Sequence, residues 1–85
     1  SYLIGNGSDC DLRLDDPFLS AHHARIRLRE SGAGYEIEDL GSKNGVFVNG
    51  LRVERAFLPK HGNLRLGRSH ISWQDKEASS PSMLN

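Results

Sequence analysis

The clearest pattern in the chain is a strict alternation of apolar and polar positions over residues 24–29, which read Ala-Arg-Ile-Arg-Leu-Arg. Side chains of a β-strand point alternately to opposite faces, so this segment is expected to bury its apolar face and expose three arginines. Residues 35–38, Tyr-Glu-Ile-Glu, alternate in the same way after a turn of small residues at 31–34. We therefore predict an antiparallel hairpin in which the glutamates lie across from the arginines.

Shorter strand patterns occupy most of the remaining chain. No segment shows the 3.6-residue period of a helix, and nine glycines separate the apolar stretches. This pattern predicts an all-β fold, a two-sheet antiparallel β-sandwich. Further strands are predicted at residues 2–5, 10–14, 46–48, 51–53, 64–66 and 69–73, with an irregular stretch at 54–57 and a loop at 58–63.

Two Asn-Gly pairs surround the short apolar strand at residues 46–48. The pair at 49–50 is the strongest local signal for a two-residue hairpin turn, because both residue types tolerate positive φ. The pair at 44–45 ends a loop of small polar residues, 41–45, that offers hydroxyl, amide, ammonium and backbone N–H donors. Such a loop either binds an oxyanion or is only a turn between two strands.

The composition narrows the class of protein. The length of 85 residues indicates one small domain, predicted over 1–74, and a linker or disordered tail at 75–85. Eleven basic and eleven acidic side chains give zero formal net charge, which argues against nucleic acid or a membrane as partner. The single cysteine, Cys10, cannot form an internal disulfide, so we expect a reducing, cytoplasmic location. The strand-like start at Ser1 is expected to belong to a longer protein.

Three motifs follow one another along the chain. A Gly-Asn pair closes the first predicted strand at 5–6, Ser20 and His23 form a Ser-x-x-His motif, and residues 39–50 read Asp-Leu-Gly-Ser-Lys-Asn-Gly-Val-Phe-Val-Asn-Gly. In this order and spacing, over residues 3–73, the chain resembles the forkhead-associated (FHA) domain family. The resemblance implies a β-sandwich whose loops at one end bind a threonine-phosphorylated protein or peptide. The strands that usually precede the first motif are missing, which leaves an open sheet edge as a route to a homo-oligomer.

The resemblance also implies which residues bind the phosphopeptide. The hydroxyl of Ser20 is expected to hydrogen-bond the phosphate, while Ser42, Lys43 and Asn44 contact the phosphate and the peptide main chain. Asn6 stands where the family usually has an arginine, so a neutral amide replaces a charged group at that position. Structural support of the binding loops is expected from a further set: Gly5, His23, Gly45, Asn49 and Gly50.

Two other kinds of site find no support in the sequence. A nucleophile pair of Ser20 and His23 lacks an orienting acid and an oxyanion hole at a suitable spacing, so no enzyme activity is expected. The cysteine and the four histidines have no standard zinc-ligand spacing. Neither a metal nor another cofactor is therefore expected.

Two functions remain open at this point. The first is a phosphothreonine-dependent protein–protein interaction module in signalling. The second is a degenerate FHA scaffold that mediates phosphate-independent binding or self-association. Asn6 and the missing leading strands motivate the second reading, whereas Arg13 and Lys43 are the candidates for supplying the charge that Asn6 lacks.

Overall fold

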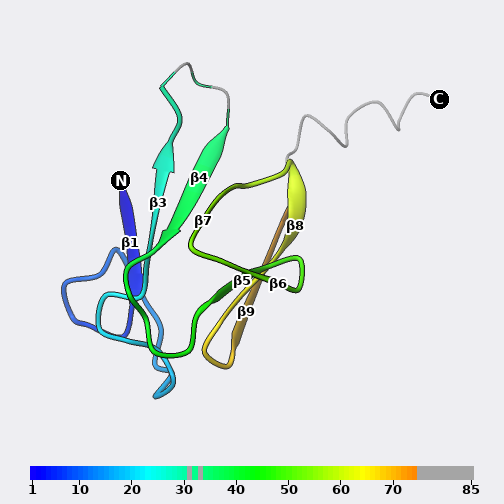
Figure 1. Ribbon diagram of the computed structural model, residues 1–85. Helices are drawn as coiled ribbons and strands as arrows, with labels where there is room; N and C mark the ends of the chain where they lie inside the picture. Colours follow the sequence, from blue (N-terminus) through cyan, green and yellow to red (C-terminus); the bar gives the residue numbers. More distant parts are fainter. Residues whose placement is uncertain (31, 33, 75–85) are drawn as a thin grey trace.

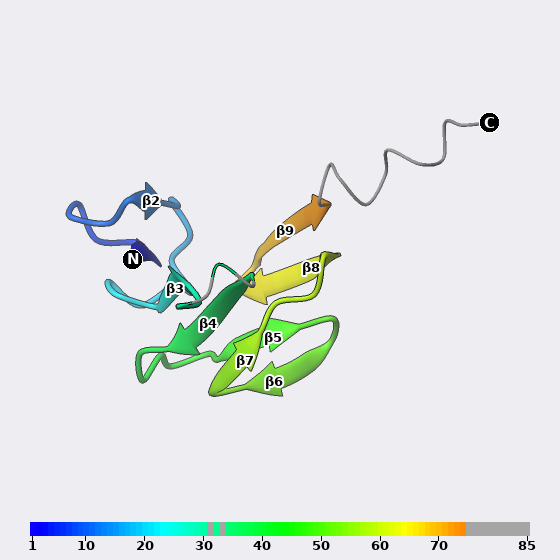
Figure 2. The ribbon, with the colours of Figure 1, turned by 90° about the horizontal axis from the view of Figure 1, so that it is seen from above.

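The computed structural model describes residues 1–30, 32 and 34–74 of the protein. These residues form nine strands: β1 (Tyr2–Gly5), β2 (Leu12–Arg13), β3 (Ala24–Leu28), β4 (Tyr35–Asp39), β5 (Val46–Val48), β6 (Leu51–Val53), β7 (Arg55–Phe57), β8 (His61–Leu66) and β9 (Ser69–Gln74). They pair into a five-stranded sheet, β2-β1-β3-β4-β7, and a four-stranded sheet, β6-β5-β8-β9 (Figure 1). In Figure 2, β1, β3 and β4 of the first sheet lie on one side and β8, β9, β5 and β6 of the second on the other, and the predicted all-β sandwich is confirmed. The pair β1–β2 runs parallel, whereas the other described pairs run antiparallel as predicted.

The core lies between the sheets and is built from the inward-facing positions of both. Alternation along the strands sends every second side chain inward, and burying a large aliphatic side chain stabilises the fold by roughly 1.5–3 kcal/mol. The buried apolar residues are at most 8% exposed: Ile4, Leu19, Ala24, Ile37, Val46, Val48, Leu64 and Leu66.

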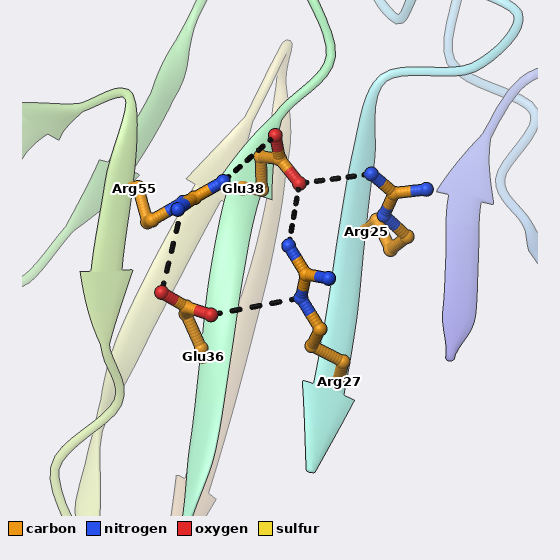
Figure 3. A network of polar contacts seen from close by, with 5 residues as sticks. All are labelled: Arg25, Arg27, Glu36, Glu38 and Arg55. Atoms are coloured by element: carbon orange, nitrogen blue, oxygen red, sulfur yellow. Dashed lines mark hydrogen bonds and ion pairs between the residues drawn. The ribbon is translucent and has the colours of Figure 1, made fainter. Parts of the chain in front are cut away.

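The predicted hairpin of β3 and β4 is confirmed in its register as well as in its position. Arg25 lies opposite Glu38 and Arg27 opposite Glu36. The distance from Arg25 Nη2 to Glu38 Oε1 is 2.9 Å, and Arg55 of β7 contacts both glutamates from the other side (Figure 3). The hydrogen bond from Arg25 lowers the pKa of Glu38. Because water screens these exposed arginines, the network sets the strand register more than it stabilises the fold.

Three segments differ from the sequence prediction by more than one residue. Residues 10–14 contain only the two-residue β2, because the residues before it form a hydrogen-bonded turn. Residues 54–57, predicted to be irregular, contain β7, which pairs with β4. The predicted loop at 58–63 is shorter, because β8 begins at His61 and pairs with β9 along its whole length. In the last two cases pairing with a neighbouring strand outweighs local sequence preference.

The hairpin turn between β5 and β6 is confirmed. Asn49 and Gly50 both have positive φ, 50° and 85°, as a type I′ turn requires. Val48 then lies directly opposite Leu51 across the turn.

The sandwich is open at the end where β3 joins β4. An apolar groove of about 1210 Å³ lies there between the sheets, with Tyr2, Leu28, Tyr35 and Trp73 in its lining. Among the described strands, β2 and β7 are the edges of one sheet and β6 and β9 those of the other, and the use of an open edge for pairing stays a prediction. The described part of the chain contains no helix that is long and apolar enough to span a membrane. The tail predicted at 75–85 lies outside the described residues.

Candidate functional site

The loops that carry the predicted binding residues gather at one end of the sandwich (Figure 1). One loop follows β1, a second leads from β2 into β3, and a third joins β4 to β5. The turn between β8 and β9 lies at the same end (Figure 1). Hydrogen bonds between these loops bring residues far apart in the sequence together.

His23 joins two of the loops from inside the protein. Its side chain is fully buried. Nδ1 accepts a hydrogen bond from the backbone N–H of Ser20 at 3.0 Å, and Nε2 lies 2.8 Å from the carbonyl oxygen of Gly45. One ring nitrogen therefore accepts and the other donates, which is the pattern of a neutral imidazole protonated on Nε2. His23 thus sets the distance between the Ser20 loop and the β4–β5 loop.

Ser20 lies where these two loops meet. Its Oγ accepts a hydrogen bond from the backbone N–H of Lys43 at 3.2 Å, and the residue is partly exposed. A hydroxyl that accepts one bond still has its own proton to donate. Ser20 and the chain at Lys43 are therefore brought together at the surface, as the sequence predicted, while the Lys43 side chain is exposed.

The β4–β5 loop is shaped by its own side chains. Asp39 Oδ1 accepts the N–H of Ser42 at 2.8 Å, and Ser42 Oγ accepts the N–H of Gly45 at 3.0 Å. Gly45 has a φ of 86°, a conformation that residues with a Cβ rarely adopt. Asn44 is exposed and donates from Nδ2 to the carbonyl oxygen of Phe18 at 2.8 Å. These bonds shape the turn that carries three candidate ligand-binding residues, Ser42, Lys43 and Asn44.

Gly5 and Asn6 bring the end of β1 against the Ser20 loop. A Cβ on Gly5 would lie only 2.1 Å from the carbonyl oxygen of Ala21, so only glycine fits there. The backbone N–H of Asn6 donates to the carbonyl oxygen of Ser20 at 3.1 Å. Its side-chain Nδ2 donates to the carbonyl oxygen of Asp16 at 2.9 Å. The amide of Asn6 thus braces the loop with one of its N–H groups, and its contact with a ligand stays a prediction.

Asn49 and Gly50 contribute to the site less directly than the sequence suggested. Asn49 exchanges two hydrogen bonds with Asn63 of β8, one through its backbone N–H and one through Oδ1, both at 2.9 Å. These contacts fasten the β5–β6 hairpin to β8. Their effect on the binding loops therefore passes through β5, which begins directly after Gly45.

Asp16 is an organising residue that the sequence analysis missed. It is 6% exposed, and Oδ1 accepts the N–H of Phe18 at 2.8 Å. Oδ2 accepts from the N–H of Arg68 at 2.8 Å and from Oγ of Ser69 at 2.7 Å. The carboxylate therefore ties the Ser20 loop to the β8–β9 turn. The available signal is an aspartate just before Pro17, which by itself indicates only the end of a strand.

The bonds to Asp16 predict a dependence of stability on pH. Hydrogen bonding, first from the Ser69 hydroxyl and then from the N–H groups of Phe18 and Arg68, lowers the pKa of Asp16 below its usual value of 3.8. The ionised carboxylate of Asp16 therefore stabilises the fold fully above about pH 4, its pKa range in the unfolded chain. This stabilisation is lost as the pH falls from there through the lower pKa of Asp16 in the folded protein. Asp16→Asn should lower the unfolding free energy at pH 7 and flatten its decline in acid. Urea titrations from pH 2.5 to 7 measure this, with the exposed Asp15→Asn as control; an unchanged acid decline in Asp16→Asn would contradict it.

The remaining candidate groups form no metal site. His22 is exposed and lies 2.8 Å from the carboxylate of Asp9, and its hydrogen bond lowers the pKa of Asp9. His23 is fully buried, and both of its ring nitrogens are hydrogen-bonded to backbone groups. Among the described residues no group of three or more histidine, cysteine, aspartate or glutamate side chains is placed to hold a metal ion.

Curated relatives share most of this chain. The chain is 37% identical over 70 residues to the FHA domain-containing protein FhaB of Mycobacterium tuberculosis, a match that covers 81% of this chain and 44% of FhaB. It is 36% identical over 67 residues to the glycogen accumulation regulator GarA of Mycolicibacterium smegmatis, covering 79% of this chain and 41% of GarA. The chain thus spans less than half the length of these relatives.

Solved structures of similar proteins have the same fold. A structure from a study of phosphothreonine-dependent FHA domain interactions has a TM-score of 0.78 and 37% identity, covering 84% of this chain and 72% of that one. Mycobacterium tuberculosis EmbR, solved in complex with a low-affinity phosphopeptide, has a TM-score of 0.78 and 34% identity, covering 86% of this chain and 19% of EmbR. The family model of the FHA domain matches residues 2–67. The chain therefore belongs to the FHA domain family, as its three motifs predicted.

Proposed function

We propose that this domain is a phosphothreonine-dependent protein–protein interaction module in signalling, which binds a partner after a kinase has phosphorylated it. The observation that carries the proposal is the junction of Ser20 with the β4–β5 loop. A buried histidine joins the backbones of the two loops that carry a partly exposed hydroxyl, a lysine and an exposed amide. One similar structure comes from a study of phosphothreonine-dependent FHA domain interactions, and a second, that of EmbR, contains a phosphopeptide.

Each residue of the proposed site has a distinct role. Ser20 donates its hydroxyl proton to a phosphate oxygen, and Lys43 adds the positive charge of its ammonium group. Ser42 offers a second hydroxyl, and Asn44 binds the peptide main chain through its amide. Asn6 has a second amide N–H for a phosphate oxygen. Hydrogen bonds to an ionised group are typically worth about 1.5–3 kcal/mol, so a few of them suffice for phosphate-dependent recognition.

In this proposal the domain recruits a phosphorylated partner protein and catalyses no reaction. Binding controlled by phosphorylation requires a compartment in which protein kinases act, and this agrees with the cytoplasmic location expected from Cys10. No cofactor, nucleic acid or membrane takes part in the proposed binding.

A peptide library tests the proposal. The immobilised domain is presented with a degenerate phosphothreonine library and with the same library lacking phosphate. We expect retention of the phosphorylated peptides only, because the site recognises a dianion by charge-assisted hydrogen bonds. Equal retention of the two libraries would refute the proposal.

A second candidate function is phosphate-independent binding or self-association. The observation that favours it concerns Asn6, whose neutral amide stands where the family usually has a charged arginine. One N–H of this amide already donates to the backbone carbonyl oxygen of Asp16. Under this alternative, the edge strand β9 pairs with a second copy of the chain. Sedimentation velocity at high protein concentration tests the self-association form of this alternative, since a monomer would count against it.

A further inference from the structure

The proposed site has too little positive charge for its ligand. A phosphothreonine carries about 1.5 to 2 negative charges at neutral pH, yet Lys43 is the only cation assigned to the site so far. The described residues include eight arginines, and six of these already have a side-chain partner. Three pair with glutamates and three lie over aromatic rings: Arg25, Arg27, Arg55, Arg29, Arg65 and Arg68.

Arg52 is a poor source of the missing charge. It lines a polar pocket of about 450 Å³ together with Gly41 and Ser42 of the β4–β5 loop and the carboxylates of Asp39 and Glu54. These two carboxylates repel a phosphate. The only other arginine is Arg13, which is exposed and makes no ion pair or ring contact within the described residues.

Arg13 lies beside the backbone on which the site is built. In the parallel pair of β1 and β2, it stands opposite Gly5. Its Nε donates to the carbonyl oxygen of Asn6 at 3.2 Å, while the N–H of the same Asn6 donates to the carbonyl oxygen of Ser20 at 3.1 Å. The guanidinium of Arg13 is therefore bonded to the same residue, Asn6, that is bonded to the backbone of Ser20, the serine proposed to bind the phosphate.

The bond to Asn6 uses little of what Arg13 can donate. A guanidinium has five N–H groups in a planar fork, and Nε supplies only one of them. Fixing Nε against the backbone leaves both terminal nitrogens for two phosphate oxygens. The anchoring also reduces the side-chain freedom that binding would otherwise have to remove.

We infer that Arg13 is a phosphate-binding residue of this domain and supplies from β2 the cation that residue 6 lacks. The inference rests on the proposed function, since it assigns a further residue to the same phosphothreonine site. Asn6 then has a double part: its side chain braces the loop through Asp16, and its carbonyl oxygen positions Arg13.

The inference is tested by calorimetry, in which the wild type and Arg13→Gln are each titrated with a phosphothreonine peptide that the domain retained from the library. We expect affinity to fall about tenfold, near the lower end for a charge-assisted hydrogen bond because Arg13 is exposed. Arg52→Gln removes the same charge beside the β4–β5 loop, next to Asp39 and Glu54, and should change affinity less than about threefold. Arg13→Gln should leave the melting temperature unchanged, which separates a ligand contact from a structural one.

A second variant tests the inference through a gain of affinity instead of a loss. Asn6→Arg places a cation beside Ser20, so it should tighten binding, and Arg13→Gln should then cost much less in this background. If the wild type binds the phosphopeptide and Arg13→Gln binds equally well, the inference is wrong while the proposed function stands. If the wild type distinguishes no phosphorylated peptide from its unphosphorylated form, both are wrong.

Discussion

Replacement of His23 by alanine is expected to lower the free energy of unfolding by about 3–5 kcal/mol. The substitution leaves a cavity at a fully buried position. It also removes the partners of two backbone groups, the N–H of Ser20 and the carbonyl of Gly45. Small domains have a total stability of about 5–15 kcal/mol, so the loss is a large part of it. Urea unfolding followed by the fluorescence of the single tryptophan, Trp73, measures the effect.

The neighbouring His22 is the matched control. It is exposed and contacts only the carboxylate of Asp9 among the described residues, so His22→Ala should leave the unfolding transition close to that of the wild type. Where His23→Ala still folds, phosphopeptide affinity should also fall, because the two binding loops lose their common anchor. A His23→Ala variant as stable as His22→Ala would contradict the anchoring role of the buried imidazole.

Replacement of Ser20 by alanine is expected to weaken phosphothreonine-peptide binding by about 10- to 100-fold, the cost of one charge-assisted hydrogen bond. The variant also loses the acceptor for the N–H of Lys43, which loosens the β4–β5 loop at the site. Because Ser20 is partly exposed, the fold should be little affected. Calorimetry gives the affinity, and Ser72→Ala, at an exposed position of β9, serves as control. Equal affinities for Ser20→Ala and wild type would remove Ser20 from the site.

The parts of the fold that the sequence predicts well are those whose signal is local. The alternation in β3 and β4 places arginines opposite glutamates, and the turn at Asn49 needs positive φ in adjacent residues. Strand β7 and the start of β8 were missed because their residues become strands through pairing with β4 and β9. Such pairing is a property of the tertiary structure, and no short window of sequence contains it.

The candidate site also has a part that local motifs predict and a part that depends on contacts between distant segments. The Ser-x-x-His and Asn-Gly motifs predict that Ser20, His23 and the β4–β5 loop belong together, and the hydrogen bonds join them. Asp16 was missed because its partners, Arg68 and Ser69, lie more than fifty residues further along the chain. The inward turn of the Asn6 amide and the approach of Arg13 depend equally on contacts between segments.

The central claim is that phosphothreonine is held between Ser20 and the β4–β5 loop, and amide chemical shifts test it most directly. A ¹⁵N-labelled domain is titrated with one phosphothreonine peptide and with its unphosphorylated form. We expect the phosphorylated peptide alone to shift the N–H signals of Ser20, Lys43 and Asn44, with that of Lys43 prominent because it bonds to the serine hydroxyl. Shifts common to both peptides, or confined to β9 and the apolar groove, would contradict the claim and favour phosphate-independent binding.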